Sequence, residues 1–565
     1  MSTAHRTEDG THAPHAAVPP ALRARLHDDP GLGTGNFLDR VRAVHPAADR
    51  PFVWAVPSGG GPEAAQAWSL DRITAARDAL AAWYHGAGVS KGVPVAVQMG
   101  DGFGYFLHFL ALSSLGAVPA LVNGGMPAAV AADYIRRTGA AGVVADTPRL
   151  EALRAAGLRA GPGMFLQEAG ALPLERSPGD RLPGVFPYPH ADTDPVMLCH
   201  TSGTTGAPKA ATFAHRQFFL GKRERLVSFP APEDGNRLLS ALPQSHSAGI
   251  SYLMTATLLG LPTMVLSDPG GPSAVAAMRA FAPTVVAAFP QTWVDLAGTD
   301  LDGAADRVHT WINTGDSAHE AHVRALVRYG RRPEGGGFRP GSRFIDGLGS
   351  SEMGMALFRK VSDPETDDYG RCVGVPIGVV EEVAVLDGDG RPVEDGRPGR
   401  LGVRTPTVTP GYWNDSGRTA LSSFSGYWLT GDVVYRDTDG RIYHLDRVPD
   451  VVHTADGPVF SLPLEEVVLS EPGVADCAVV AVPDPGTGAM APYAVVRPAE
   501  GAEPPADLLG ALNARLEAAG LARLRGASAV RSEEDFPLGP TGKVLKRRLR
   551  ERFADALGGP VGSPA

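Results

Sequence analysis

A loop of nine residues carries the side-chain types that hold phosphate groups. It follows a short apolar run at 195–199 that predicts a strand, and it reads Thr201-Ser202-Gly203-Thr204-Thr205-Gly206-Ala207-Pro208-Lys209. Glycines let backbone N–H groups approach an anion, hydroxyl groups add donors, and the lysine adds a mobile positive charge. The spacing differs from the Walker pattern G-x-x-x-x-G-K-[ST], which the chain lacks. The segment therefore predicts a loop that grips a triphosphate.

The same string resembles the signature of the adenylate-forming superfamily: acyl- and aryl-CoA synthetases, nonribosomal peptide adenylation domains and beetle luciferases. More motifs follow in the family's order, so the resemblance covers the chain from about residue 50 to 552. It implies that the loop holds the β- and γ-phosphates of ATP while a carboxylate attacks the α-phosphorus. It further implies Mg²⁺ as the metal, coenzyme A as the acceptor, and AMP held as part of an acyl adenylate.

A second motif, Gly349-Ser350-Ser351-Glu352, resembles the family's G-x-T-E. The resemblance implies that Ser351 contacts the α-phosphate region and that Glu352 holds Mg²⁺, with Thr205 as a further metal-binding residue. Carboxylate and phosphate oxygens together suit a hard cation. The family usually has an aromatic residue before the first glycine, where adenine stacks. This chain has Leu348, which loses the π-face contact, worth about 1 kcal/mol.

Three residues in the second half of the chain gain roles from the same resemblance. Asp432 ends the motif at 427–432 and would accept hydrogen bonds from the two ribose hydroxyls. Arg447 would contact ribose or phosphate. Lys543, in the loop at 537–543, would stabilise charge between the carboxylate and the α-phosphate. We expect the basic run at 546–552 to be a solvated or salt-bridging helix face, with contact to the 3′-phosphate of CoA as a weaker alternative.

The resemblance also implies an acyl pocket. Residues 243–249 resemble the family's P-x-x-H-x-x-G, in a form most like very-long-chain acyl-CoA synthetases and fatty-acid transport proteins. We expect His246 to line or gate the pocket and to take part in catalysis, with Gly249 beside it. Gly315 and Asp316 stand where relatives have the turn that floors the acyl site. The expected lining is mostly small or apolar, which favours a hydrophobic carboxylate as substrate: Gln244, Ala248, Thr314, Leu348 and Met353.

The segment around Arg447 departs from the family pattern G-R-x-D-D-x-I-K. The glycine is Asp446 and the first aspartate is Pro449. In the family this segment is the hinge about which the small domain rotates between two half-reactions. Proline fixes φ and removes a backbone donor, so we expect reduced or relocated hinge freedom. The following loop, which helps to line the pantetheine tunnel in relatives, is altered at Pro458.

These departures leave several functions open. The leading one is an ATP-dependent acyl-CoA ligase that activates a hydrophobic carboxylic acid through an acyl adenylate. A second is a half-reaction specialist that only adenylates, or only joins acyl-AMP from a partner enzyme to CoA; transfer to a carrier-protein thiol is a variant. A third is a noncatalytic acyl-nucleotide binder, against which the retained Lys543 argues. A homodimer is compatible with each.

Beyond its motifs, the chain predicts an α/β fold. Strand and helix patterns alternate over 68–145 and again over 236–348, which favours parallel β-sheets covered by helices. Short strands joined by Asp-Gly turns over 379–446 predict a small β-barrel-like part. We expect four regions: a disordered stretch at 1–25, a large N-terminal domain at 26–447, a small mobile α+β C-terminal domain at 448–553, and a disordered tail at 554–565.

Composition adds outer bounds. The 565 residues exceed one ordinary hydrophobic core, and a formal net charge of −10 argues against nucleic acid as a partner. Cys199, Cys372 and Cys477 show no disulfide or metal spacing, which fits a reducing compartment. The most apolar run, 106–122, is too short and too interrupted to span a membrane. With no secretory signal pattern over 1–25, we expect a cytoplasmic protein without a transmembrane segment.

Overall fold

A computed structural model describes residues 17–100, 102–201, 208–229, 235–532, 534–539 and 542–558. Its first sheet has six strands in the order β6-β5-β3-β4-β7-β8, parallel except for the antiparallel pair β7–β8. The strands are β3 (Pro94–Gln98), β4 (Val118–Leu121), β5 (Gly142–Ala145), β6 (Phe165–Glu168), β7 (Pro195–Thr201) and β8 (Lys209–Ala214). The helices between them are α4 (Gly104–Ser114), α5 (Ala128–Thr138) and α6 (Thr147–Ala155), preceded by α3 (Leu70–Gly86). The expected strand–helix alternation is confirmed here.

Helix α3 begins two residues later than Trp68, where the apolar pattern starts. Trp68 belongs to strand β2 (Gln66–Ser69), and the Ser69 hydroxyl accepts a hydrogen bond from the backbone N–H of Arg72 at 3.1 Å. This N-cap satisfies a free donor of the first helical turn and sets where the helix starts.

The second sheet is the larger one. Its parallel part pairs β10-β9-β11-β12-β15 with β1 beside β10, and β2 is antiparallel at the edge. The strands are β1 (Pro51–Val56), β9 (Leu238–Ala241), β10 (Thr263–Leu266), β11 (Val285–Ala288), β12 (Thr310–Asn313) and β15 (Arg343–Asp346). The helices are α7 (His215–Ser228), α8 (Ser247–Leu259), α9 (Gly271–Phe281), α10 (Pro290–Ala297) and α11 (Glu320–Val327). β9, β10, β11 and β12 are buried along their whole length, as strands covered on both faces must be.

The β-rich region expected at 379–446 continues this sheet in antiparallel fashion. Pairing runs from β15 through β16, β17, β22, β21 and β19 to β18. The bounds are β16 (Phe358–Ser362), β17 (Cys372–Pro376), β18 (Glu382–Leu386), β19 (Gly399–Arg404), β21 (Tyr427–Arg436) and β22 (Ile442–Arg447). Asp387 and Asp437 each accept from backbone N–H groups of the following turn residues, which fixes the predicted hairpins.

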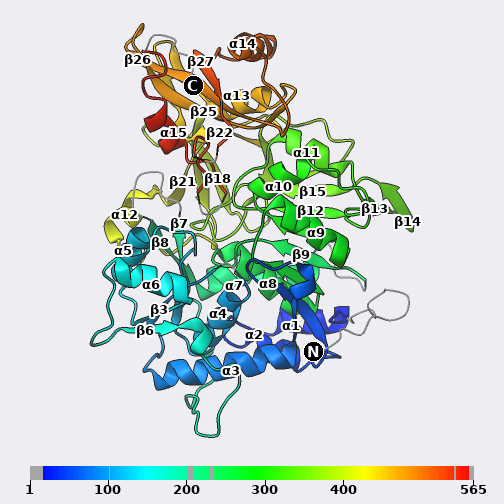
Figure 1. Ribbon diagram of the computed structural model, residues 1–565, viewed down its shortest axis with the longest axis vertical. Coiled ribbons are helices and arrows are strands. Elements are labelled where there is room, and N and C mark those ends of the chain that lie inside the picture. The colour runs from blue at the N-terminus through cyan, green and yellow to red at the C-terminus, as the bar shows by residue number, and fades with distance from the viewer. Residues whose placement is uncertain are drawn as a thin grey trace.

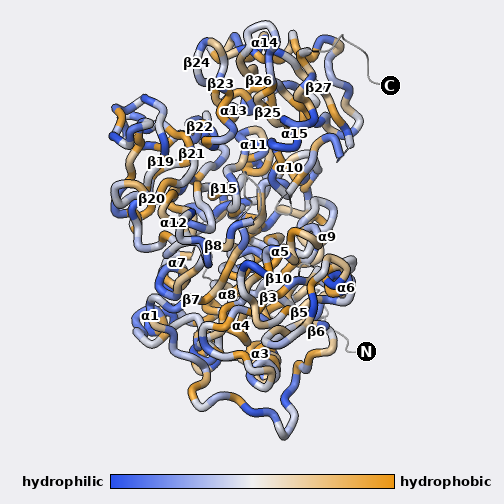
Figure 2. Tube along the Cα trace, turned by 90° about the vertical axis from the view of Figure 1, so that its left-hand side faces the viewer, coloured by the Kyte–Doolittle hydropathy of each residue, from blue (hydrophilic) through white to orange (hydrophobic). Residues whose placement is uncertain are grey.

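A small C-terminal domain follows β22 and lies at one end of the molecule in both views (Figures 1 and 2). Its three-stranded sheet has the order β25-β26-β27. The elements are β23 (Val452–Thr454), β24 (Gly457–Val459), α13 (Ser461–Val468), β25 (Val474–Asp484), β26 (Ala489–Pro498), α14 (Leu508–Ala518), β27 (Gly526–Ala529) and α15 (Lys546–Arg552). Two apolar clusters, one on each face of this sheet, are separate from the cores of the large domain.

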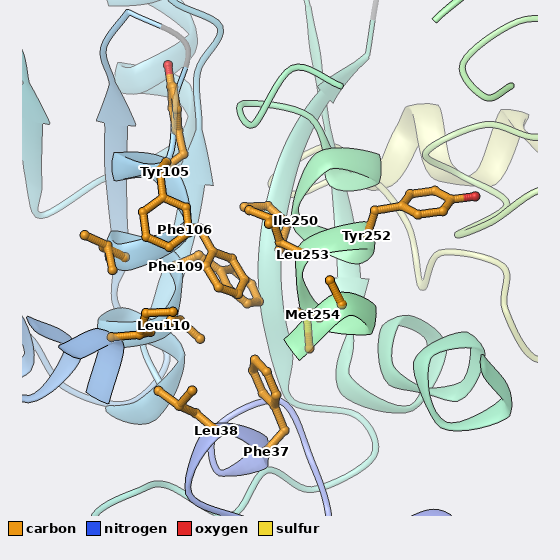
Figure 3. Packing of buried hydrophobic residues seen from close by; sticks show 14 of the residues in the cluster. Phe37, Leu38, Tyr105, Phe106, Phe109, Leu110, Ile250, Tyr252, Leu253 and Met254 are labelled. Atoms are coloured by element: carbon orange, nitrogen blue, oxygen red, sulfur yellow. The ribbon is translucent and has the colours of Figure 1, made fainter. Parts of the chain in front are cut away.

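The core between the two large sheets is formed by helices. In Figure 3, Phe106 and Phe109 of α4 point toward Ile250 and Leu253 of α8, and Phe37 of α2 (Phe37–Arg42) closes the layer. All five residues are fully buried. The apolar run at 106–122 is therefore a core helix and strand, and no described helix is long and apolar enough to cross a membrane.

The expectation of disorder is wrong for part of the N-terminal stretch. Residues 1–16 lie outside the described residues, but helix α1 (Pro20–Asp28) begins at Pro20. Proline suits the first turn of a helix because its missing N–H would have no partner there. Val18 and Leu26 are buried, and Arg23 donates to the carbonyl of Leu226 in α7 at 3.4 Å. At the other end, residues 554–558 form turns, and 559–565 are outside the described residues.

Gly374 in β17 tests how tightly the antiparallel strands are packed. Its φ is +87°, and an added Cβ would collide with the carbonyl oxygen of Arg359 in β16. We expect Gly374→Ala to lower the free energy of unfolding by more than about 1 kcal/mol, measured by urea denaturation. Gly370→Ala is the control, since Gly370 has φ +67° but open space around an added Cβ. Equal losses in the two variants would contradict a steric contribution from the strand contact.

Candidate functional site

A cavity of about 770 Å³ opens between the large sheets and the C-terminal domain. The carboxyl ends of β12 and β15 meet its floor at Asn313 and Asp346, where ligands bind in open α/β sheets. Most of the sequence-predicted site lines it: Thr201, Lys209, His246, Gly315, Gly349, Ser350, Ser351, Glu352, Arg447 and Lys543. Residues more than 300 positions apart in sequence therefore share one cavity.

The phosphate loop itself lies mostly outside the described residues. This holds for Ser202, Gly203, Thr204, Thr205 and Gly206, and so for the metal-binding role expected of Thr205. The two ends of the loop are described: Thr201 ends β7, Lys209 begins β8, and the two are paired positions of one antiparallel ladder. Both line the cavity, so the hairpin presents its connecting loop to this site.

Some predicted residues take other places. Leu348 and Met353 are 4% and 0% exposed and belong to the apolar core beneath the antiparallel strands, so neither offers a surface to the cavity. Gly249 lies in α8 against the backbone of Pro243 and is not a lining residue. An alternating pattern buries Leu348 and leaves Gly349 at the cavity, where an added Cβ would come within 2.6 Å of Ala356 Cα.

Glu352 is held by a tyrosine that the sequence did not single out. The phenol of Tyr412 donates to Glu352 Oε1 at 2.8 Å, and Lys209 Nζ lies 3.4 Å from the same phenol oxygen and 4.9 Å from the ring centroid. Burial lowers the pKa of Lys209. One carboxylate oxygen of Glu352 thus remains for a cation. A hard ion that takes its other ligands from phosphate and water fits this donor set, as Mg²⁺ does.

Asp432 does not itself line the cavity, but it contacts Arg447, which does. Its side chain is 1% exposed, and neither carboxylate oxygen has a hydrogen-bond partner among the described residues. Two basic groups lie near Oδ1 of Asp432: Arg447 Nη1 at 3.1 Å and His444 Nε2 at 3.4 Å. Burial acts to raise the pKa of Asp432, but the charge of Arg447, together with His444 and Thr430, outweighs it and lowers the pKa to about 2. Two buried acceptors without donors fit a ligand with two adjacent hydroxyl groups, such as ribose.

Lys543 reaches the cavity from the C-terminal domain. Its Nζ lies 3.3 Å from Asp316 Oδ2, at the turn after β12. Asp316 is 44% exposed; partial desolvation would raise its pKa, but the charge of Lys543, followed by His444 and Arg371, lowers it, so this carboxylate stays ionised. Asp316 is therefore the partner of the predicted catalytic lysine, which gives its acidic character a role. Gly315 beside it, with φ +94°, packs against the Phe289 ring.

Two histidines face the same space. His246 caps α8, and its Nδ1 accepts a hydrogen bond from the backbone N–H of Ala248 at 3.1 Å. Burial lowers the pKa of His246 to about 3 and that of His200 to about 4. Both rings are neutral at physiological pH, and an acceptor at Nδ1 puts the proton of His246 on Nε2. His246 thus offers a donor and no base, and His200, which lines the cavity, is a residue the sequence reading missed.

The cavity extends beyond this polar centre into an arm between α7 and α8. Ala248 and Thr314 line the cavity as expected, but Gln244, Leu348 and Met353 do not. Charged and hydroxyl side chains line the arm together with apolar ones: Glu224, Arg225, Ser228, Ser251, Tyr252 and Arg359. The expectation of a mostly small or apolar lining is therefore wrong for this arm, since single residues read in sequence did not reveal the helix faces.

The C-terminal domain is held over the cavity by a buried carboxylate. Glu466 of α13 accepts from His319 Nδ1 at 2.8 Å, from the Glu320 backbone N–H at 3.0 Å and from Arg371 at 3.0 Å. Burial would raise the pKa of Glu466, but His319 and Arg371 lower it to about 2. The neighbouring His322 ring contacts the Ala475 carbonyl at 3.0 Å. These contacts tie α11 to α13.

The basic run at 546–552 is only partly a surface feature. Lys546 Nζ lies 2.7 Å from Glu465 Oε1 and donates to the Ser461 hydroxyl at 2.6 Å. Arg550 pairs with Asp450 at 2.7 Å. Arg547, more than half exposed, is the solvated member with an i,i+4 partner. The expected salt-bridging is confirmed for these residues, but Lys546 is not at the solvated surface, because this side of the short helix faces the domain junction.

Comparison with known proteins identifies the family. The family model described as AMP-binding enzyme matches residues 41–413, and that of the AMP-binding enzyme C-terminal domain matches residues 463–543. The chain belongs to the AMP-binding enzyme family. The adenylate-forming superfamily inferred from the motifs is thereby confirmed, and with it an enzyme that binds ATP or AMP.

Several relatives of this AMP-binding enzyme carry names that refer to aromatic substrates. A 3-aminoavenalumate diazotase from Streptomyces sp is 40% identical over 559 residues, covering 94% of this chain and 98% of the relative. A 3-amino-2-hydroxy-4-methoxybenzoate diazotase from Streptomyces cremeus is 27% identical, covering 80% and 84%. A salicyl-AMP ligase / salicyl-S-ArCP synthetase from Mycobacterium tuberculosis is 26% identical, covering 95% and 94%. The narrower likeness to very-long-chain acyl-CoA synthetases gains no support from these relatives.

A solved structure confirms the fold. The crystal structure of the anthranilate CoA ligase AuaEII in complex with anthranoyl-AMP superposes with a TM-score of 0.78 at 19% identity, covering 94% of this chain and 99% of that chain. The α/β fold with a large N-terminal mixed-sheet domain and a small C-terminal domain is thus the fold of adenylate-forming enzymes.

The contact between His319 and Glu466 makes the domain interface pH-dependent. Burial lowers the pKa of His319, but Glu466 raises it above the usual 6.5 overall, and Glu466 itself falls below the usual 4.5. The His319 contribution is complete below pH 6.5 and disappears as pH rises through the raised pKa; that of Glu466 is complete above pH 4.5 and disappears toward pH 2. The contact is therefore strongest between those two values.

We expect Glu466→Gln to lower the melting temperature more at pH 6 than at pH 9, measured by scanning calorimetry, because the protonated His319 then loses its anion. Part of the effect remains at pH 9, since Arg371 keeps its charge. Glu471→Gln is a control, because Glu471 pairs with Arg515 within the C-terminal domain. A Glu466→Gln effect that is equal at the two pH values would contradict a charged His319.

Proposed function

We propose that this AMP-binding enzyme adenylates a small oxyacid and passes the activated group to an aromatic amine without using CoA. The observation that carries the proposal is a buried network at the domain junction. Asp446, where the family has a flexible glycine, is 1% exposed and accepts from the Ser461 backbone N–H at 2.6 Å and from its hydroxyl at 2.9 Å. Lys546 and Glu465 complete the network from α15 and α13.

This network joins the last strand of the large domain to two helices of the small one. Burial alone would lower the pKa of Lys546, but the carboxylates of Glu465 and Asp446 raise it, so the lysine stays charged. Breaking such a buried, hydrogen-bonded group leaves an uncompensated charge, which is costly. Pro449 further limits the backbone beside it. The junction therefore favours the arrangement that keeps Lys543 at the cavity, which serves adenylate formation, over a rotation that would admit pantetheine.

The names of two relatives supply the acceptor class. Both diazotases, one of them 40% identical over nearly the whole chain, are named for an amino-substituted carboxylate. Diazotisation requires a nitrosating agent, and nitrite is an oxyacid anion of the kind that an adenylating site can activate. We therefore infer ATP, nitrite and an aromatic amine as the substrates, with AMP and pyrophosphate as products.

The proposed reaction has two steps, adenylation of nitrite and transfer of the nitrosyl group to the amine. A nitrite oxygen attacks the α-phosphorus, a P–O bond forms, and pyrophosphate leaves. The amine nitrogen then attacks the nitrosyl nitrogen: an N–N bond forms, the N–O bond breaks, and AMP leaves with the electron pair. Loss of the amine proton gives an N-nitrosamine, and its tautomer, once protonated, loses water to give the diazonium ion. The leaving group of the second step is AMP instead of hydroxide, which makes the substitution possible at neutral pH.

The residues of the cavity suit these steps. Asp432 would hold the ribose hydroxyls, and Lys543 would stabilise charge on the α-phosphate as the new bond forms. Glu352, with Tyr412 on one oxygen, would hold Mg²⁺, which supplies charge neutralisation on the phosphates when bound. The neutral His246 would donate from Nε2 to an oxygen of the activated group, since its Nδ1 is occupied by the Ala248 N–H.

Acyl-CoA ligation is the second candidate, because the same family contains the anthranilate CoA ligase that shares this fold. It would need the C-terminal domain to rotate, and so would need the Asp446 network to open. A carrier-protein thiol as acceptor, as named for the salicyl enzyme, makes the same demand. Both alternatives use a carboxylic acid as the adenylated group.

An isotope experiment separates these candidates. We expect AMP release to require both nitrite and an aromatic amine, with no increase from CoA, when purified protein is given ATP and Mg²⁺. Nitrite labelled with ¹⁸O should transfer one labelled oxygen to AMP, and ¹⁵N-nitrite should place its label in the diazonium group, read by mass spectrometry after coupling to a phenol. AMP formation from a carboxylic acid and CoA in the absence of nitrite would overturn the proposal.

Lys543→Ala should slow adenylate formation by about 10²–10³-fold, because it removes a positive charge that acts on the transition state. The measurement is nitrite-dependent exchange of labelled pyrophosphate into ATP. Arg547→Ala is the matched control, since Arg547 is exposed and, among the described residues, its ion pair is with Glu551 on its own helix. Unchanged exchange in Lys543→Ala would show that the lysine faces the cavity without acting in the reaction.

A further inference from the structure

The arm of the cavity between α7 and α8 contains a guanidinium group that has no carboxylate partner. Arg225 lines the arm, and its Nη1 donates to the hydroxyls of Ser251 at 3.1 Å and Thr255 at 3.3 Å. Its Cζ lies 4.5 Å from the centroid of the Tyr252 ring. Within the described residues, no carboxylate forms an ion pair with it. Two hydroxyls and one aromatic face thus fix the group and leave its charge uncompensated.

The charged groups around Arg225 favour an anion. Lys222, one turn earlier on α7, is 3% exposed and donates to the Phe218 carbonyl, but burial lowers its pKa well below the usual 10.5, so it adds little positive charge. Arg359 also lines the cavity. The nearest acidic neighbour in sequence, Glu224, also lines the cavity, but its side chain is 60% exposed and lies 3.9 Å from His27. An exposed carboxylate is screened by water and offsets little of the positive potential inside the arm.

Arg225 lies at a definite depth from the reaction centre. Helix α8 begins at Ser247, next to His246. The charge of Lys543 contributes to the lowered pKa of His246, which places the two groups near each other. Ser251 and Thr255 follow Ser247 by about one and two turns, which places the contacts of Arg225 roughly 6 and 12 Å farther along the axis at 1.5 Å per residue. The cavity lining also includes apolar and aromatic groups: Ile312, Phe289, Phe229 and Tyr252.

We propose that Arg225 binds a carboxylate at the far end of the amine substrate. The substrate is then an aromatic amine whose amino group lies at the adenylate and whose carboxylate lies about one to two helical turns away, across a flat apolar spacer. A planar guanidinium pairs with a carboxylate through two parallel hydrogen bonds, and Nε and Nη2 of Arg225 have no partner among the described residues. This assignment rests on the proposed function for the position of the amine.

The selectivity follows from the same geometry. A neutral analogue leaves the guanidinium inside the arm without its anion, so it loses a charge-assisted bond that the acid gains. We therefore expect the wild-type enzyme to prefer an aminoaryl carboxylic acid over the corresponding primary amide by about tenfold or more in kcat/KM. An amine with its carboxylate directly on the ring should be too short to reach Arg225 and should show a smaller preference.

The experiment measures this acid-over-amide ratio in variants. Arg225→Met should reduce the ratio to near one, chiefly through a higher KM for the acid, and Arg225→Lys should retain part of it because charge remains but the planar fork is lost. Arg216→Met is the matched control, since Arg216 is exposed on the same helix and does not line the cavity. Product is followed by trapping the diazonium ion with an electron-rich phenol.

Two outcomes would overturn the assignment. If Arg225→Met lowers kcat/KM for acid and amide equally, Arg225 only ties α7 to α8 through Ser251 and Thr255. If the wild-type ratio is near one, the arm does not read a carboxylate. Calorimetric binding of the acid and the amide in the presence of AMP gives the same ratio without turnover. If the enzyme binds the acid more tightly than the amide but forms no diazonium product, the proposed reaction is wrong and the role of Arg225 is retained.

Discussion

One buried carboxylate, Asp446, fixes the junction at which the small domain leaves the large sheet. It accepts three hydrogen bonds, from the backbone N–H groups of Arg447 and Ser461 and from the Ser461 hydroxyl, at a point where the last strand of the large sheet meets α13. Lys546 binds the same hydroxyl, so α15 joins the network. Together with the Arg550–Asp450 pair, these contacts fix the direction in which the small domain leaves the sheet. Lys543, three residues before Lys546, enters the cavity as a consequence.

The two lysines illustrate how burial divides one short segment into a fixed and a movable part. Lys546 is 15% exposed and pairs with a Glu465 carboxylate that is 3% exposed, whereas Lys543 and Asp316 are 33% and 44% exposed. Exposed pairs contribute little, since water screens them and long side chains lose entropy. Lys543 can therefore leave Asp316 for a phosphate oxygen at small cost. If Lys546 left Glu465, a buried charge would lose its partner, which is costly. Lys543 can therefore move while Lys546 stays bound.

The sequence predicted the fold and the polar residues at the centre of the cavity better than the other residues that line it. The ordered motifs, through their resemblance to the adenylate-forming superfamily, assigned Lys209, Glu352 and Lys543 to one site, and all three line the cavity. The hydrogen-bond partners were not predictable: Tyr412 reaches Glu352 across a distance in sequence that no local pattern encodes. The alternating burial that turns Leu348 inward, and the helix faces that put Arg225 in the arm, depend on how elements pack. The altered hinge was visible as a departure, but its consequence required the contacts of Asp446.

A fixed junction suits a reaction whose two steps need no large second substrate. A CoA-dependent enzyme must open a tunnel for pantetheine, so it must give up the contacts that hold Lys543 in the first step. An amine that already lies in the arm between α7 and α8 can attack the activated group while the small domain stays closed. Gly542 packs against Gln291 at the rim, and Glu466 holds α13 to α11. Such closure limits the access of water, which would otherwise hydrolyse a mixed anhydride of AMP before the amine attacks. In the proposed reaction, a junction that restricts rotation would therefore also protect the intermediate.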